Sequence, residues 1–207
     1  MLFRSETIEC YDELLKMKPK DAWMWHAKIL VLYKMNKSDD AEKCIGEILA
    51  IQPDEVWELR DKASVLEKLG RHRDAIECHE KIIENYPGMS RNSWLDKGRI
   101  LEQLQENDDA LGCYDKVLES GWNVRAWQCK AKLLEKLGRY EDAVSYYDKI
   151  IERDSVNVSA LEGKGGALYK IQKYEESIKC YEKILEIAPK GAQGTLQKIR
   201  EIKSQMS

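Results

Sequence analysis

Residues 124–157 read VRAWQCKAKLLEKLGRYEDAVSYYDKIIERDSVN, and this stretch decides the fold. In its second half the apolar residues recur at spacings of three and four, as in Ala143, Tyr147 and Ile150. That spacing places them on one face of an α-helix. Gly138, near the centre of the stretch, is a residue type that ends helices and turns the chain. The stretch therefore predicts two helices joined by a tight turn.

The same pattern recurs along the chain with a period of about 34 residues, which is marked by prolines. Pro19, Pro53 and Pro87 are evenly spaced, and Pro189 lies three periods after Pro87. A proline ends a helix because it lacks the amide proton and clashes with the preceding turn. With each proline set as position 32 of a repeat, position 20 is always small. It is occupied by Thr7, Ala41, Ala75, Ala110, Ala143 and Ser177.

This counting divides the chain into five full repeats, with a half-repeat before them and one helix after them. Residues 1–21 supply only the second helix of a repeat, and residues 192–207 read as a solitary amphipathic helix that caps the array. We expect about twelve helices in an all-α solenoid. The full repeats are residues 22–55, 56–90, 91–123, 124–157 and 158–191.

These features resemble the tetratricopeptide repeat, a helix–turn–helix module with a signature of Trp, Leu, Gly or Ala, Tyr, Ala, Phe or Tyr, and a terminal Pro. Trp25, Trp94 and Trp127 match its first position, and Gly98 and Gly165 match its close-packing position. The resemblance covers nearly the whole chain, in the style of prokaryotic arrays. It implies a right-handed superhelical solenoid of antiparallel helix pairs.

Composition narrows the class of function. The chain has 207 residues, of which 43% are apolar and 34% charged, and this suits a solenoid with much wet surface. A net charge of −3 argues against nucleic acid as a partner, because duplex binding requires clustered Lys and Arg. No stretch approaches the roughly 20 apolar residues of a spanning helix. We expect a soluble, cytoplasmic protein that binds neither nucleic acid nor membrane.

The six cysteines predict packing residues and no metal site. Cys129 is alone in a first helix, and no pair has the close spacing of a zinc site. Reduced thiols fit a reducing compartment. The other five share position 23 of successive second helices: Cys10, Cys44, Cys78, Cys113 and Cys180.

Nothing in the sequence converges on a catalytic site. His26 lies in a first helix, His72 lies in a turn, and His79 replaces the core aromatic residue of repeat 2. The glycine-rich run at residues 163–166 lacks the spacing and the Ser or Thr of a phosphate loop. Its glycines instead predict a soft first helix in repeat 5. We expect no enzyme activity, no catalytic residue, no cofactor and no metal.

Lysine recurs at position 7 of every repeat and allows two interpretations. It could form a basic ridge for an acidic partner, or, as the family resemblance implies, each stem could be buried between first helices while the ammonium reaches water or a neighbouring Glu. We favour the second interpretation. The residues are Lys28, Lys62, Lys97, Lys130 and Lys164.

The family resemblance implies a concave groove lined by first helices at positions 2, 5, 6, 9, 12 and 13. In repeats 1 and 2 these positions carry aromatic residues, which dominate binding energy at interfaces. Packing of Trp23 and Trp57 on the preceding second helix is the alternative. The Lys and Asn run that clamps chaperone tails is missing, so we expect no binding of such tails. The candidate residues are Trp23, His26, Leu30, Tyr33, Trp57, Arg60, Arg99, Arg125, Lys132 and Lys136.

The predicted function is a non-catalytic scaffold that binds a peptide or helical segment of a partner protein, which would be partly acidic with apolar anchors. In one alternative, the chain is a structural array that forms homo-oligomers through its half-repeat. In another, it is a fragment of a larger regulatory protein with these repeats. The candidate self-association residues are Leu2, Phe3, Ile8 and Leu15.

Overall fold

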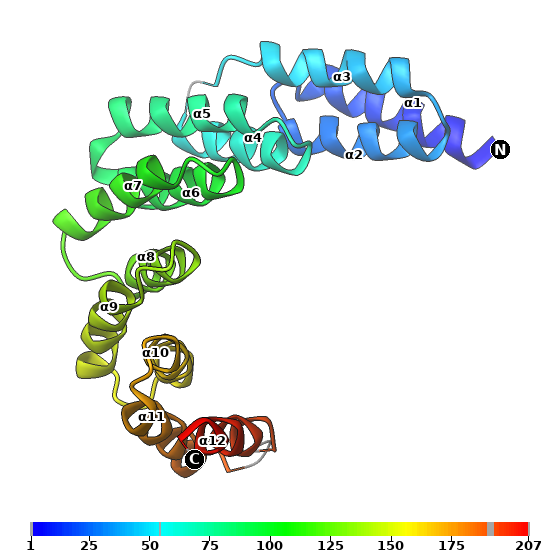
Figure 1. The fold of residues 1–207 in the computed structure, drawn as a ribbon. Helices are drawn as coiled ribbons and strands as arrows, with labels where there is room; N and C mark the ends of the chain where they lie inside the picture. The colour runs from blue at the N-terminus through cyan, green and yellow to red at the C-terminus, as the bar shows by residue number, and fades with distance from the viewer. Residues whose placement is uncertain (1, 54, 190–192, 207) are drawn as a thin grey trace. The chain divides into compact units, whose positions relative to one another are not determined.

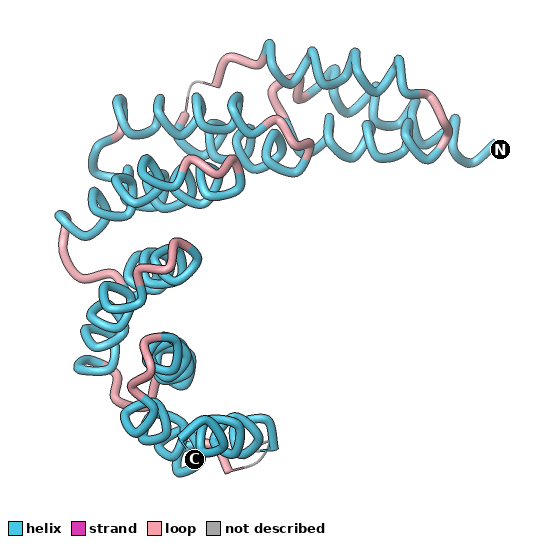
Figure 2. The backbone as a smooth tube through the Cα atoms, viewed as in Figure 1, coloured by secondary structure: helices cyan, strands magenta, loops and turns pink. Residues whose placement is uncertain are grey.

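The computed structural model describes residues 2–53, 55–189 and 193–206, without the side chains of residues 2–5. In these ranges all regular structure is helical (Figures 1 and 2). The predicted all-α array of helix pairs is confirmed. The helices are α1 (Leu2–Met17), α2 (Ala22–Lys34), α3 (Ser38–Ala50), α4 (Val56–Lys68), α5 (His72–Asn85), the 3-10 turn η1 (Pro87–Met89), α6 (Ser90–Gln103), α7 (Asn107–Glu119), α8 (Val124–Lys136), α9 (Tyr140–Arg153), α10 (Val158–Lys170), α11 (Tyr174–Ile187) and α12 (Gln193–Met206).

The chain forms two compact units, Met1–Ile100 and Leu101–Ser207, and the boundary falls within α6. In the N-terminal unit α1 packs on α2, α2 on α3 and α4 on α5. In the C-terminal unit each helix from α7 to α12 packs on the next, as Figure 1 shows for α8 to α12. First helices also touch, since α2 contacts α4 and α10 contacts α8. The repeat boundaries drawn from the sequence remain our proposal.

Each helix pair is joined by the same turn, in which position 15 has a positive φ. Gly70 and Gly138 occupy it with φ of 73° and 74°, but Asn36, Gln105 and Gln172 adopt it too. The next amide donates to the carbonyl of the position-11 leucine in all five repeats, at 2.8 to 3.0 Å. This is the Schellman ending of a helix. The glycines therefore marked a turn that the other three repeats make without them.

The second helices supply much of the core. Position 20 is fully buried in every full repeat, from Ala41 to Ser177, and small side chains fit there because the two helices of a pair approach closely. Position 24 buries the rings of Tyr114, Tyr147 and Tyr181. At the C-terminal end, α12 packs Ile199 and Ile202 against a cluster that contains Tyr181. Leu196 of the same helix is exposed.

The half-repeat helix α1 differs from the expectation. Leu15 is only 5% exposed and belongs to the core, so it is not available to a second copy of the chain. Ile8 is half-buried and Cys10 is exposed, whereas Leu2 and Phe3 lie outside the described side chains. In the described part of the chain, every helix is too short or too polar to cross a membrane.

Candidate functional site

In the N-terminal unit, large apolar side chains are exposed on the first helices. We call them the first-helix face: Trp23 (37% exposed), Leu30 (47%) and Tyr33 (41%) on α2, and Trp57 (60%) on α4. The other large apolar residues of these two helices are buried, such as Ile29 and Leu66, or half-buried, such as Trp25. The alternative in which Trp57 packs on the preceding second helix is therefore wrong, because Trp57 is mostly exposed.

Trp23 lies among side chains of α2 and α4. The Lys68 ammonium is 4.5 Å from the centroid of its ring, and the His26 ring meets it edge-on at 5.9 Å. Burial and then the charge of Lys68 lower the pKa of His26, so this imidazole is neutral at pH 7. Tyr33 donates from its hydroxyl to Glu42 on α3 at 3.4 Å. Trp23 and His26 thus contact each other on α2.

Arg60 is half-buried on α4, one turn after Trp57. Its Nη2 donates to the carbonyl of Met89 at 3.3 Å, at the end of η1. Its Nε is buried and has no hydrogen-bond partner among the described residues. This guanidinium is therefore anchored to the protein by a single neutral acceptor.

The remaining candidates are basic residues on α6 and α8. Arg99 on α6 belongs to the N-terminal unit and pairs with Asp96 at 3.1 Å. Arg125, Lys132 and Lys136 are exposed on α8 of the C-terminal unit. There Lys136 Nζ lies 2.9 Å from Glu102, which also accepts the Tyr114 hydroxyl. Exposed ion pairs of this kind contribute about 0 to 1 kcal/mol to stability.

The lysines at position 7 do not form a free basic ridge. In four repeats the ammonium pairs with a carboxylate at position 25 of the preceding second helix, which confirms the second interpretation. The pairs are Lys28 with Asp12, Lys97 with Glu80 and Lys164 with Asp148, each at 2.5 Å, and Lys130 with Asp115.

Repeat 2 breaks this rule because its preceding helix has Gly46 at position 25. Lys62, which is only 7% exposed, donates instead to the carbonyls of Leu49 at 2.9 Å and Ile51 at 2.7 Å. Burial lowers the pKa of Lys62. By contrast, burial also opposes the charge of Lys130, but its interactions with Asp115 and Tyr146 together outweigh that effect and raise its pKa. The carboxylate is what Lys62 lacks.

A model of the tetratricopeptide repeat matches residues 60–124 and 130–192, which is more than half of the sequence. The chain belongs to the tetratricopeptide repeat family. The resemblance drawn from the tryptophans, glycines and prolines is therefore confirmed. No curated protein sequence matches the chain.

Solved structures of tetratricopeptide proteins share the fold. The C-terminal part of a repeat protein from Cytophaga hutchinsonii has a TM-score of 0.65 at 16% identity, over 90% of this chain and 74% of that one. YrrB, described as having an unusual peptide-binding site, has a TM-score of 0.59 at 17% identity over 92% and 99%. The first such domain of Spaghetti, bound to the HSP90 peptide SRMEEVD, has 0.51 at 23% over 56% and 92%.

His79 is a buried histidine at a position where three other tetratricopeptide repeats of this chain carry tyrosine. It is only 5% exposed, and its Nδ1 has no hydrogen-bond partner among the described residues. Burial lowers its pKa; Asp96 opposes this effect, whereas Arg60 and Lys97 reinforce it. The imidazole is therefore neutral in the folded protein at pH 7.

We expect His79→Tyr to reduce the loss of stability in mild acid. As pH falls below the ordinary value of 6.5, the unfolded chain takes up a proton at His79 that the folded chain does not. The stability from neutral His79 is thus present above that pH and is lost below it. Urea unfolding at pH 7.5 and at pH 5.5 should show a loss smaller by about 1 kcal/mol in the variant. Equal losses in both proteins would show that His79 takes up its proton in the folded state.

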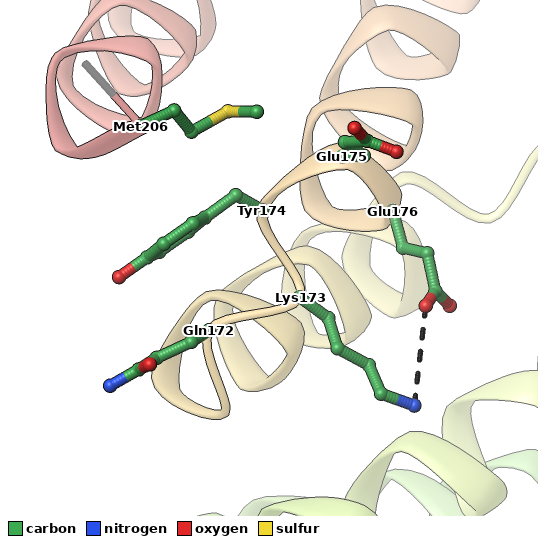
Figure 3. Close-up of a pocket in the computed structure, with 6 residues that line it drawn as sticks. All are labelled: Gln172, Lys173, Tyr174, Glu175, Glu176 and Met206. Carbon is green, nitrogen blue, oxygen red and sulfur yellow. Dashed lines mark ion pairs between the residues drawn. The ribbon is translucent and has the colours of Figure 1, made fainter.

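Two hollows lie outside the predicted residues. One is lined by the turn before α11, by the first residues of α11 and by Met206 of α12, and there Lys173 and Glu176 approach within 4.0 Å (Figure 3). The other lies among α1, α2 and α3, and its Lys28 and Lys43 pair with its own Asp12 and Asp40. Neither hollow was predicted from the sequence, because each joins residues from separate parts of the array. In both hollows some of the lining acids and bases pair with each other.

Proposed function

We propose that the protein is a non-catalytic scaffold that binds a peptide or helical segment of a partner protein on the first-helix face. The observation that carries this proposal is the joint exposure of Trp23, Leu30, Tyr33 and Trp57 on helices whose other large apolar residues are buried or half-buried. Aromatic residues supply much of the binding energy at interfaces. Paired helices hold them in place before binding, which limits the entropy lost on association.

The likeness to other tetratricopeptide proteins supports a peptide as the class of ligand. YrrB is described with a peptide-binding site, and the Spaghetti domain is bound to an HSP90 peptide. We do not propose that this chain binds the HSP90 peptide. The clamp for chaperone tails requires Asn at positions 9 and 6, where this chain has Leu30 and Asp61 in repeats 1 and 2. The proposed place of action is the cytoplasm, where the buried free thiols stay reduced.

The test compares the native chain with a Trp23→Ala/Trp57→Ala double variant as bait in a cytosolic extract. Bound proteins are identified by mass spectrometry, and the affinity of the main partner is then measured. We expect the double variant to bind that partner at least about 30-fold more weakly, because each lost aromatic anchor costs on the order of 1 kcal/mol or more. Trp122→Ala is the control, since Trp122 is also exposed but lies outside this face.

The alternative outcomes separate the competing functions. Equal capture by the native chain and the double variant would move binding away from the first-helix face. Capture of further copies of the chain alone would favour self-association through α1, a prediction from the sequence. Replacing the half-buried Ile8 with Asp should then change the molar mass in solution.

A further inference from the structure

Arg60 differs from the candidate cations Arg99 and Lys136 because its charge has no carboxylate partner among the described residues. No described carboxylate lies within ion-pairing distance of its guanidinium, and its single hydrogen bond is to the neutral carbonyl of Met89. Arg99 pairs with Asp96, and Lys136 pairs with Glu102. An arginine keeps its charge at every physiological pH. A half-buried guanidinium with one neutral partner therefore gains when a carboxylate binds it.

The surroundings of Arg60 orient its guanidinium before a carboxylate binds. The Nη2–Met89 bond and the burial of Nε fix the inner edge of the guanidinium. A guanidinium binds a carboxylate through two parallel hydrogen bonds, and this geometry demands a defined orientation of the fork. A fork that is oriented before binding loses less entropy when the complex forms.

Apolar surface flanks the guanidinium. Trp57 lies three residues before Arg60 on α4, and residues at this spacing share a helix face. Met89, whose carbonyl accepts from Arg60, has a side chain that is about half exposed. Two turns further along α4, the Lys68 ammonium covers Trp23 and also has no described carboxylate partner. The first-helix face thus combines apolar contacts with two uncompensated cations.

We propose that the peptide bound by the first-helix face places the side-chain carboxylate of an Asp or Glu on Arg60, with an apolar residue beside it on Trp57 and Met89. This inference rests on the proposed function and specifies the chemistry of its ligand. One guanidinium fork matches one carboxylate. A side chain within the bound segment is therefore the expected source.

The test is selection of short random peptides displayed on phage against the full chain, with the same selection on Arg60→Met. The native chain should enrich peptides with an Asp or Glu next to an aromatic or large aliphatic residue. Arg60→Met should enrich the apolar residue without the acid. Arg125→Met is the matched control, because Arg125 is an exposed arginine at a first-helix position of the other unit.

A peptide selected by the native chain is then used to measure how much Arg60 contributes to the binding affinity. Arg60→Met in the protein, or the acid-to-amide change in the peptide, should each weaken binding about tenfold, and the two together should cost little more than either alone. Arg60→Lys should retain part of the affinity, because lysine keeps the charge and loses the fork. Unchanged thermal unfolding of both variants would exclude misfolding as the cause.

The failures can be told apart. Enrichment of apolar peptides without an acid would overturn the role of Arg60 and leave peptide binding intact. An acidic preference of equal strength on Arg60→Met would also overturn it and point to Lys68. If no peptide were enriched on the native chain, both this inference and the proposed function would be wrong.

Discussion

Replacing Gly163 with alanine is expected to destabilise the C-terminal unit by about 2 kcal/mol, although alanine is the better helix former. A methyl group at Gly163 would lie 2.5 Å from the hydroxyl oxygen of Tyr147 and 2.6 Å from its Cε1. Tyr147 cannot give way freely, because its ring is buried on α9 and its hydroxyl donates to Glu135 at 3.1 Å. Burial raises the pKa of that hydroxyl, so it remains a donor. Either the ring or α10 has to move.

Gly166→Ala is the matched control in the same helix. A methyl group there would meet only the Tyr181 hydroxyl, at 3.9 Å, which is ordinary contact. This variant should be more stable than the native chain by up to about 1 kcal/mol, from helix propensity alone. The two variants should thus differ by about 3 kcal/mol in urea unfolding. Hydrogen exchange in residues 159–170 should localise the change. If both variants are stabilised, Gly163 does not serve close packing.

The three glycines of α10 show where reasoning from the sequence ends. Intrinsic propensity predicts a soft helix for Gly163, Gly165 and Gly166 alike. In the structure Gly163 faces the Tyr147 ring and Gly165 lies against Tyr181, at 3.1 Å for an added methyl group. The family pattern anticipated this closeness for Gly165 only. Which ring faces which glycine depends on how neighbouring helices pack, and local propensity contains no such information.

Other features of the fold and the site also separate into those that the sequence predicts and those that depend on contacts between helices. The regular spacing of the prolines and leucines predicted the helix pairs, because the signals that start, sustain and end a helix lie within a few residues of each other in the sequence. The sequence left two alternatives for Trp57, the groove or packing on the preceding helix, and it did not predict the burial of Leu15, since both follow from contacts between helices. The pairing of the position-7 lysines was predictable in kind, but not the acid at position 25 that accepts each one. The anchored state of Arg60 depends on Met89, 29 residues away in sequence.

Gly46→Asp is expected to stabilise the N-terminal unit by about 1 to 2 kcal/mol. Gly46 occupies the position at which four other second helices provide the acid for a position-7 lysine, and a side chain at Gly46 would meet nothing within 4 Å. An aspartate there would give buried Lys62 the partner that it lacks. The gain combines a charged hydrogen bond with the removal of a helix glycine, which are worth about 1.5 and about 0.5 kcal/mol before ordering costs.

The control for this variant is Gly46→Asn, which has nearly the same shape and helix propensity but no charge. The difference between the two in urea unfolding at pH 7 isolates the ion pair. Since a pair with buried Lys62 is poorly screened, most of that difference should persist at high salt. The aspartate should also raise the pKa of Lys62, because a close carboxylate favours the charged amine. If Asp and Asn stabilise equally, only the glycine mattered, and the carbonyls of Leu49 and Ile51 already satisfy Lys62.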